Sequence, residues 1–365
     1  MFRWLTIAVM MILLPLLGIV AAGRELKPYL EFPPLTRYLP HAGFSRPWFV
    51  FFVIVDLLLI GFLLWTVRFG HRNLPAQSVI SDIKGRFPWW GWAGIVLCLA
   101  SWVLAWTRFT WFSFLQQHTF FPIWLGFIFF INAVTAWRCG SCLLLRQPIG
   151  FLMLFPVSAG FWWLFEFYNR FVQNWYYTGI ENMGPVAYFC FASLAFTTVL
   201  PGVLSMTDLL LTFPALDRGL VCSKQLSLQT SRWIPLIALI LAGAGLLLIG
   251  LFPDQLFALL WVSPLLIILS IQRLAGRPTM LASLRHGDWR PLLVPAMAAI
   301  ICGFFWEMWN YFSFARWSYA IPYVQRYHLF EMPILGYGGY LPFGLECLLV
   351  GRQVIGDPFR NHAPN

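Results

Sequence analysis

Long apolar runs recur along almost the whole chain, and they constrain its fold more than any other feature. A helix rises about 1.5 Å per residue, so a run of roughly 20 apolar residues covers the hydrocarbon core of a bilayer. The sequence therefore predicts an all-α, polytopic transmembrane helical bundle of about ten spans. The predicted spans are 4–22, 47–67, 89–107, 120–137, 149–168, 186–211, 233–252, 256–271, 291–312 and 330–350.

Composition agrees with this prediction and excludes other classes. The chain is 60% hydrophobic and only 10% charged, whereas soluble proteins carry about 25% charged residues. The net charge of +10 is interpreted as loop Lys and Arg at a membrane surface. A basic helix, an RNA-binding aromatic signature and zinc-ligand spacing are all missing from the sequence. The expected partners are therefore membrane lipids, a lipid-soluble substrate, and either further copies of the chain or a membrane complex, but not nucleic acid.

The distribution of Lys and Arg predicts the orientation. With ten spans, the termini and the even-numbered loops carry about twice as many basic residues as the odd-numbered loops. This places both termini in the cytoplasm and the protein in the inner (cytoplasmic) membrane. The first run ends in Ala21-Ala22-Gly23, which is compatible with a cleaved signal. Its apolar core is longer than that of most signals, which favours a retained helix.

The chain also contains an approximate repeat with an offset of 141 residues. The corresponding pairs are Glu166 and Glu307, Asn169 and Asn310, Phe171 and Phe312, Leu200-Pro201 and Leu341-Pro342, and, after a slip of one residue, Trp175 and Trp317, and Tyr177 and Tyr319. Each copy would hold four spans, so both copies would have the same orientation. The predicted organisation is an N-terminal two-span hairpin with its loops (1–88), a first repeat (89–232), and a second repeat with the tail (233–365).

The repeated motif contains the candidate functional residues. In each copy a helix ends in Glu-x-x-Asn, whose spacing puts both side chains on one helix face. An aromatic loop follows, and then a further helix. We expect catalytic roles for Glu307, Glu331 and Asn310, and substrate contacts from Trp306, Trp317, Tyr319, Glu166, Asn169, Trp175 and Tyr177.

Placing a charged carboxylate within a membrane span costs free energy, so an acid in such a position is a candidate functional residue. A desolvated Glu is protonated for part of the time and can act as a general acid, while aromatic faces can stabilise a cation. The alternative is structural: each Glu accepts hydrogen bonds from its Asn and from a loop Tyr or Trp, and fixes the loop. Glu331 occurs in the second copy only, where the first copy has Cys190, which favours an active second copy.

The acid, the aromatic loop and the following helix start in the second copy resemble the membrane carotenoid enzymes, namely the heterodimer-type lycopene cyclases and the related carotenoid hydratases. About 45 residues carry this resemblance, through Glu307, Trp317, Tyr319, Glu331 and Pro333. The chain departs from those families because Glu331 precedes Pro333, a Glu-Glu pair is missing, and each predicted repeat has four spans instead of three. The resemblance implies protonation of an isoprenoid double bond, completed by cyclisation or by addition of water.

Other constellations carry less weight. All six His residues fall outside the predicted spans, which argues against a transmembrane bis-His haem. Metal boxes, Ser-His-Asp sets and phosphate-binding Gly loops are not visible in the sequence, so we expect neither a cofactor nor a metal. Cys139 and Cys142 have redox-motif spacing, but the predicted cytoplasmic location keeps thiols reduced. Asp56 lies in mid-span, where pairing with an Arg or membership of an ion path would explain it.

Two classes of function stay open at this stage. The first is an intramembrane enzyme of the cyclase or hydratase kind, with Glu307 and Glu331 converging on one apolar pocket. The second is a transporter or a non-catalytic membrane subunit or scaffold, in which Asp56 and the repeated acids would line a polar path. The sequence favours the enzyme slightly.

Overall fold

The computed structural model describes residues 2–32, 38–72, 86–221, 223–226 and 231–359. Within these residues, seven helical segments are long and apolar enough to cross a membrane, which indicates an integral membrane protein. They are α3 (Arg46–Arg72), α4 (Trp89–Trp106), α5 (Phe120–Cys139), α7 (Pro148–Val172), α8 (Pro185–Phe196) with α9 (Val199–Leu210), α14 (Arg290–Tyr311), and α15 (Tyr340–Ile355) with the 3₁₀ turn η3 (Ile334–Gly339) before it.

Three further apolar helices are shorter, namely α1 (Phe2–Ala21, apolar from Leu5), α11 (Trp233–Leu248) and α13 (Leu259–Leu274). The remaining elements are α2 (Lys27–Leu30), η1 (Thr110–His118), α6 (Leu143–Arg146), β1 (Trp175–Thr178), α10 (Pro214–Val221), α12 (Pro253–Leu256), η2 (Met280–His286), β2 (Arg316–Tyr319), β3 (His328–Leu329) and β4 (Met332–Pro333). Every predicted span therefore contains a helix, and among the described residues seven of the ten are long and apolar enough to cross a membrane.

The predicted tenth span is wrong in its first part. Residues 330–339, which we expected to be helical, form the turn between β3 and β4, then β4 and η3. Phe330 has a positive φ of 59°, which an α-helix does not allow. Pro333 lacks a backbone N–H, and the glycines that follow have low helix propensity. Regular helix therefore begins only at Tyr340. Residues 73–85 of the predicted N-terminal hairpin lie outside the described residues.

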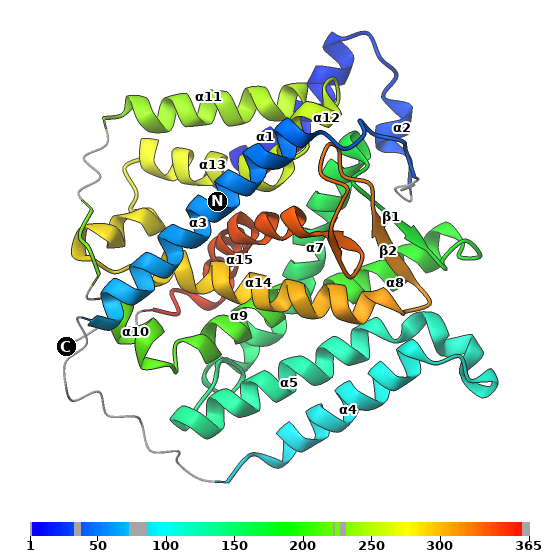
Figure 1. Cartoon of the computed structure of the whole chain (residues 1–365), viewed down its shortest axis with the longest axis vertical. Helices are drawn as coiled ribbons and strands as arrows, with labels where there is room; N and C mark the ends of the chain where they lie inside the picture. The colour runs from blue at the N-terminus through cyan, green and yellow to red at the C-terminus, as the bar shows by residue number, and fades with distance from the viewer. Residues whose placement is uncertain (1, 33–37, 73–85, 222, 227–230, 360–365) are drawn as a thin grey trace.

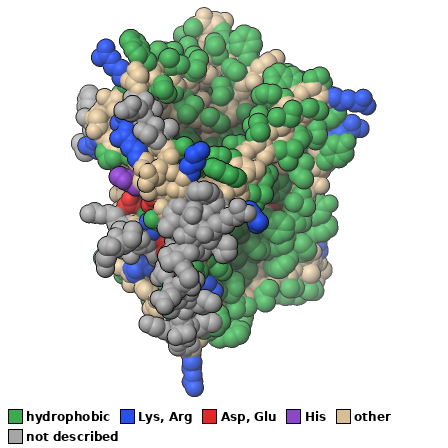
Figure 2. Space-filling view, turned by 60° about the vertical axis from the view of Figure 1, so that its left-hand side comes forward, with side chains coloured by type: hydrophobic (Ala, Val, Ile, Leu, Met, Phe, Trp, Pro, Cys, Tyr) green, Lys and Arg blue, Asp and Glu red, His purple; other side chains and the backbone are tan. Residues whose placement is uncertain are grey.

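The exterior is apolar, as expected for a surface in contact with lipid. Hydrophobic side chains cover much of the face drawn in Figure 2, and Lys and Arg side chains are scattered over it. Large apolar side chains such as Leu58 and Ile149 are 68% and 77% exposed. In water such a surface would be a binding or aggregation site, whereas in a bilayer it contacts acyl chains.

Eight of the helices form three groups (Figure 1). The pair α4 and α5 lies along one edge of the molecule, and the pair α11 and α13 lies along the opposite edge. The centre between these pairs consists of α7, α9, α14 and α15. In it, α7 packs against α9 and α15, and α14 also packs against α9 and α15.

A short two-stranded sheet closes one end of this centre (Figure 1). β1 follows α7, β2 follows α14, and the two strands are antiparallel. In the register, Trp175 is opposite Tyr319, and Tyr177 is opposite Trp317. The two aromatic loops of the motif, which are far apart in the chain, are therefore direct neighbours.

Candidate functional site

Glu166 lies near the end of α7 and is completely buried. Its Oε1 atom accepts hydrogen bonds from Trp162 Nε1 (3.0 Å), Trp175 Nε1 (3.1 Å) and the Tyr177 hydroxyl (2.6 Å). Trp162 lies one turn before Glu166 on α7, while Trp175 and Tyr177 come from β1. We call this group of four residues the Glu166 site.

Glu307 lies near the end of α14 and is also completely buried. Its Oε1 atom accepts hydrogen bonds from the hydroxyls of Tyr319 (2.7 Å) and Tyr340 (2.9 Å). Trp317 Nε1 in turn donates to the Tyr319 hydroxyl (2.9 Å). We call these four residues the Glu307 site. Among the described residues, the Oε2 atoms of Glu166 and Glu307 both lack a hydrogen-bond partner.

The two Asn residues of the motif hold the strands in place. Asn169 Nδ2 donates to the Trp175 carbonyl (2.7 Å), and its Oδ1 accepts from the backbone N–H of Asn174 (2.8 Å) and Trp175 (3.3 Å). Asn310 donates to the Trp317 carbonyl (2.7 Å) and accepts from the Trp317 N–H (2.9 Å). Each Asn therefore supplies both a donor and an acceptor to one strand, which fixes the aromatic side chains next to the acid.

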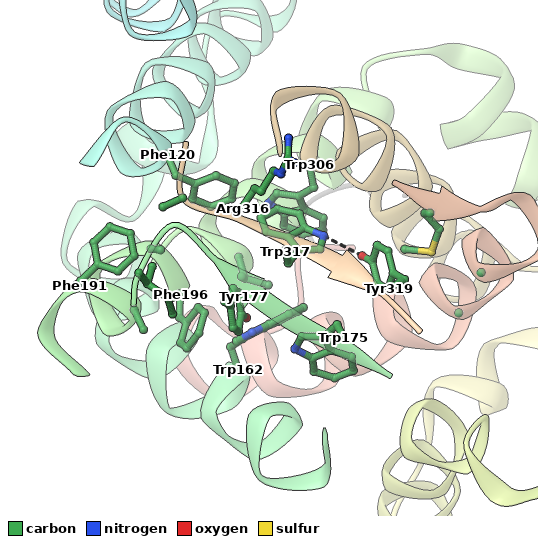
Figure 3. Close-up of a pocket in the computed structure, with 18 of the residues that line it drawn as sticks. Phe120, Trp162, Trp175, Tyr177, Phe191, Phe196, Trp306, Arg316, Trp317 and Tyr319 are labelled. Atoms are coloured by element: carbon green, nitrogen blue, oxygen red, sulfur yellow. Dashed lines mark hydrogen bonds between the residues drawn. The ribbon is translucent and has the colours of Figure 1, made fainter. Parts of the chain in front are cut away.

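A cavity of about 110 Å³ lies between the sheet and the ends of the central helices. Its walls are mainly aromatic, and side chains from β1 and β2 face into it together with residues of α5, α7, α8, α13, α14 and α15 (Figure 3). The lining consists of Phe120, Trp162, Trp175, Tyr177, Ile180, Tyr188, Phe191, Ala192, Ala195, Phe196, Val199, Trp261, Trp306, Ala315, Arg316, Trp317, Tyr319, Met332, Gly336, Gly339 and Tyr340.

The predicted substrate-binding aromatics come together in this lining, and the predicted polar residues lie behind it. Trp175, Tyr177, Trp306, Trp317 and Tyr319 all line the cavity. The two carboxyl groups and the two Asn amides do not belong to the described lining. The acids reach the cavity only through the phenols and indoles that bond them, because those side chains belong to both groups.

Glu331 lies apart from this lining as well. It is half-buried in the turn between β3 and β4, and Ser318 Oγ is 3.4 Å from its Oε2 atom. Ser318 alternates with Trp317 and Tyr319 along β2, and alternate residues of a strand point to opposite faces. Glu331 is therefore on the far side of β2 from the two aromatic residues that line the cavity. Glu307 and Glu331 were expected to converge on one pocket, but neither carboxyl group belongs to the described lining.

The phenols of the two loops remain protonated at neutral pH. Burial raises the pKa of the Tyr177 hydroxyl well above its usual value of about 10, and the neighbouring Glu166 carboxyl raises it further. Burial and then Glu307 act on the pKa of Tyr319 in the same direction. Both hydroxyls are therefore hydrogen-bond donors over the physiological pH range.

The sequence did not reveal three important residues. Trp162 and Tyr340 each donate to an acid, and a Cβ on Gly303 would lie 2.4 Å from the Tyr340 ring. At the offset of 141 residues, Trp162 corresponds to Gly303, and Val199 corresponds to Tyr340. At each of these two positions one copy has a large aromatic residue and the other has a smaller one. A comparison that looks only for identical residues misses this correspondence.

The arrangement can do two things chemically. The aromatic faces can bind an apolar group and stabilise a positive charge on it, and the phenols can pass a proton between a buried acid and that group. Among the described residues, no group of three or more His, Cys, Asp or Glu side chains could hold a metal ion. Comparisons of the chain with protein-family models, with curated proteins and with solved structures found no significant match.

Proposed function

We propose that this integral membrane protein is an enzyme that binds the unsaturated part of a lipid-soluble, isoprenoid-like substrate in the aromatic cavity and protonates it. The observation that supports this proposal most strongly is the double role of Tyr319 and Tyr340. Both hydroxyls bond the buried Glu307 carboxyl, and both residues line the cavity. A proton donor therefore lies one hydrogen bond behind an apolar, aromatic binding site.

The proposed step is a proton relay. When Glu307 carries the proton, the contact of 2.7 Å with Tyr319 lets the carboxyl group donate to the phenol oxygen, while the proton of the phenol passes to one carbon of a double bond. A C–H bond forms, the π bond breaks, and the cation left on the other carbon is stabilised by the aromatic walls. Loss of a neighbouring proton, or addition of water with loss of one of its protons, then completes the reaction, and the released proton returns through Tyr319 to the Glu307 carboxylate.

The chemistry of the donors favours the Glu307 site over the Glu166 site. Glu307 is bonded by two phenols, whose oxygen both accepts and donates. Glu166 is bonded by two indoles and one phenol. An indole N–H only donates, so it cannot pass on a proton that it receives. The single phenol at Glu166, Tyr177, could relay a proton in the same way, but Glu307 has two such phenols. We therefore assign the proton transfer to Glu307, and substrate binding and support of the sheet to Glu166 with Asn169.

We further propose that the chain is a pair of parallel four-span repeats related by an axis along the membrane normal. The sheet register supports this, because Trp175 pairs with the counterpart of Tyr177, and Tyr177 pairs with the counterpart of Trp175. Such reciprocal contacts are expected across a two-fold axis. The central packing has the same reciprocity, since α7 contacts α15 and α14 contacts α9. With both termini cytoplasmic, the sheet and the cavity lie near the outer surface of the inner membrane.

The test compares lipid extracts by mass spectrometry from cells that express the wild-type chain, Glu307→Gln, or Glu166→Gln at matched protein levels. We expect a lipid product that depends on the wild-type chain, falls by about a hundredfold or more in Glu307→Gln, and persists in Glu166→Gln. Full product formation by Glu307→Gln would overturn the acid role. Movement of an unmodified solute across vesicles that contain the protein would instead support the transporter.

A further inference from the structure

The lining of the cavity includes a single charged side chain among the described residues, that of Arg316. Arg316 begins β2 and lies beside Phe120 and Trp317 in Figure 3. Its Nη1 atom donates to the Tyr311 carbonyl at the end of α14 (3.1 Å). A guanidinium group has five N–H donors, so this contact leaves most of them for another acceptor.

A second guanidinium group reaches the same point. Arg108, just beyond the end of α4, donates from Nη2 to the Phe312 carbonyl (2.8 Å), and Phe312 follows Tyr311 in the chain. Burial, and then the positive charge of Arg316, lowers the pKa of Arg108. Among the described residues, neither arginine forms an ion pair with a carboxylate. Arg108 itself is exposed, lies outside the described lining, and also donates to the Ala105 and Thr107 carbonyls. Of the two cations, Arg316 is therefore the one that lines the apolar cavity, and it does so without a carboxylate partner among the described residues.

The helix end explains only part of this arrangement. Cations near the C-terminus of a helix are stabilised by its dipole, which accounts for one contact of each arginine with α14. It does not account for the position of Arg316 in the wall of an aromatic cavity, where an uncompensated charge is costly. An anionic group on the ligand would remove that cost, and guanidinium groups match phosphate oxygens in geometry.

We propose that the ligand of the cavity is an amphipathic lipid whose phosphate group is bound by Arg316, with Arg108 nearby, and that the first unit of its apolar tail lies among the aromatic walls. This inference rests on the proposed function in taking the cavity as the substrate site. A cavity of about 110 Å³ is comparable to an engineered one of about 150 Å³ that binds benzene. It therefore holds a group of about one ring or isoprene unit, and the remainder of the tail extends into the bilayer.

The test compares two probes with the same tail, farnesyl phosphate and farnesol, for binding to the purified full-length protein in uncharged detergent. We expect farnesyl phosphate to bind at least about tenfold more tightly than farnesol, in line with a charge-assisted contact. Arg316→Gln should remove this preference without changing the affinity for farnesol, and Arg108→Gln should reduce the preference by a smaller factor. Arg326→Gln is the matched control, because Arg326 is exposed and stacks on Phe44, 4.7 Å from the ring, and it should bind both probes as the wild type does.

Equal affinity of the wild type for the two probes would overturn the proposal, as would an equal loss of preference in Arg326→Gln, which would indicate a bulk charge effect. Inorganic phosphate should displace farnesyl phosphate only weakly, and displacement at similar concentrations would overturn the assignment to a lipid. Tyr319→Phe separates this proposal from the catalytic one. If that variant keeps full turnover while the phosphate preference depends on Arg316, the acid role fails and the headgroup site stands.

Discussion

The Glu166 and Glu307 sites place the same acid behind the same cavity, yet they obtain one of their hydrogen-bond donors from different helices. At the Glu166 site this donor is Trp162, one turn away on α7 itself. At the Glu307 site the corresponding residue on α14 is Gly303, and the Tyr340 ring of α15 fills the space and bonds the acid. Each acid thus receives a hydrogen bond from one large aromatic side chain on a helix, but the helix and the kind of donor differ.

This difference shows how one architecture can present two kinds of hydrogen-bond donor to a buried acid. An indole at the Glu166 site gives a fixed donor, whereas a phenol at the Glu307 site gives a group that both donates and accepts. Tyr340 also connects α15 to α14 at the end of the bundle, so the acid of the second site depends on the packing of two helices. Matched changes in the two sites should therefore have different effects.

The largest expected effect is on turnover. Tyr319→Phe removes the hydroxyl between Glu307 and the cavity, and turnover should fall by about 10²–10⁴, as for loss of a general acid. The matched change, Tyr177→Phe, should cost much less because Tyr177 bonds the acid to which we assign no proton transfer. Product formation by membranes with equal amounts of each variant measures this. A larger loss in Tyr177→Phe would reverse the assignment of the two sites.

The second prediction tests whether the Tyr340 ring needs the space beside Gly303. Gly303→Ala places a Cβ within 2.4 Å of the Tyr340 ring, so the ring must move. We expect a destabilisation of about 1–3 kcal/mol from overpacking, together with reduced turnover. Gly160→Ala on α7 is the control, because a Cβ there meets nothing within 4 Å. Thermal unfolding in detergent measures both changes, and unchanged stability and turnover in Gly303→Ala would contradict the proposed role of Tyr340.

The third effect concerns the Asn residues that hold the strands. Asn169→Ala removes three hydrogen bonds to the loop after α7, and Asn310→Ala removes two from β2. Each change leaves buried backbone groups without a partner, at a cost of about 1–3 kcal/mol, and the loss should be larger for Asn169→Ala. Midpoints of unfolding in detergent give the comparison. The reverse order would show that the two strands are not held in equivalent ways.

The smallest effect concerns alkaline titration. Because burial and a neighbouring acid raise the pKa of Tyr177 and Tyr319, their neutral forms persist to higher pH, and their charges appear only above the raised values. The tyrosinate absorbance that develops up to about pH 10.5 should therefore be the same in the wild type, Tyr177→Phe and Tyr319→Phe. A decrease in either variant would mean that the phenol is exposed to water, and that its site is open.

Local patterns predicted the membrane class and the position of the motif well. Apolar runs report helices directly, and the spacing of Glu307 and Asn310 put both side chains at the end of α14. The start of the last helix was wrong because local backbone conformation decides it: Phe330 adopts a positive φ, and β4 precedes the helix. The sequence carries a signal against helix here, in Pro333 and the glycines that follow it, but the apolar character of the run favoured a span.

The sequence predicted which residues belong to the candidate site, but not how they are arranged around the cavity. Trp317 and Tyr319 were expected near Glu307, and they lie near it. The structural alternative expected each acid to accept hydrogen bonds from a loop Tyr or Trp, and the structure has those bonds. It also expected a bond from the Asn of each motif to the acid, whereas Asn169 and Asn310 bond the strands. Arg316 received no role from the sequence, because an arginine in a loop of a membrane protein is ordinary until its neighbours are known.

The sequence by itself determined that this protein belongs in a membrane and that two Glu-x-x-Asn motifs precede two aromatic loops, because hydropathy and helical spacing are local properties of the chain. Only the tertiary structure decided that the loops pair as β1 and β2, that Tyr340 reaches Glu307, and that both acids lie one hydrogen bond behind a shared cavity. The physical reason is that hydrogen-bond partners for a buried acid are selected by proximity in space. Here some of those partners lie on other helices, where no local pattern can indicate them.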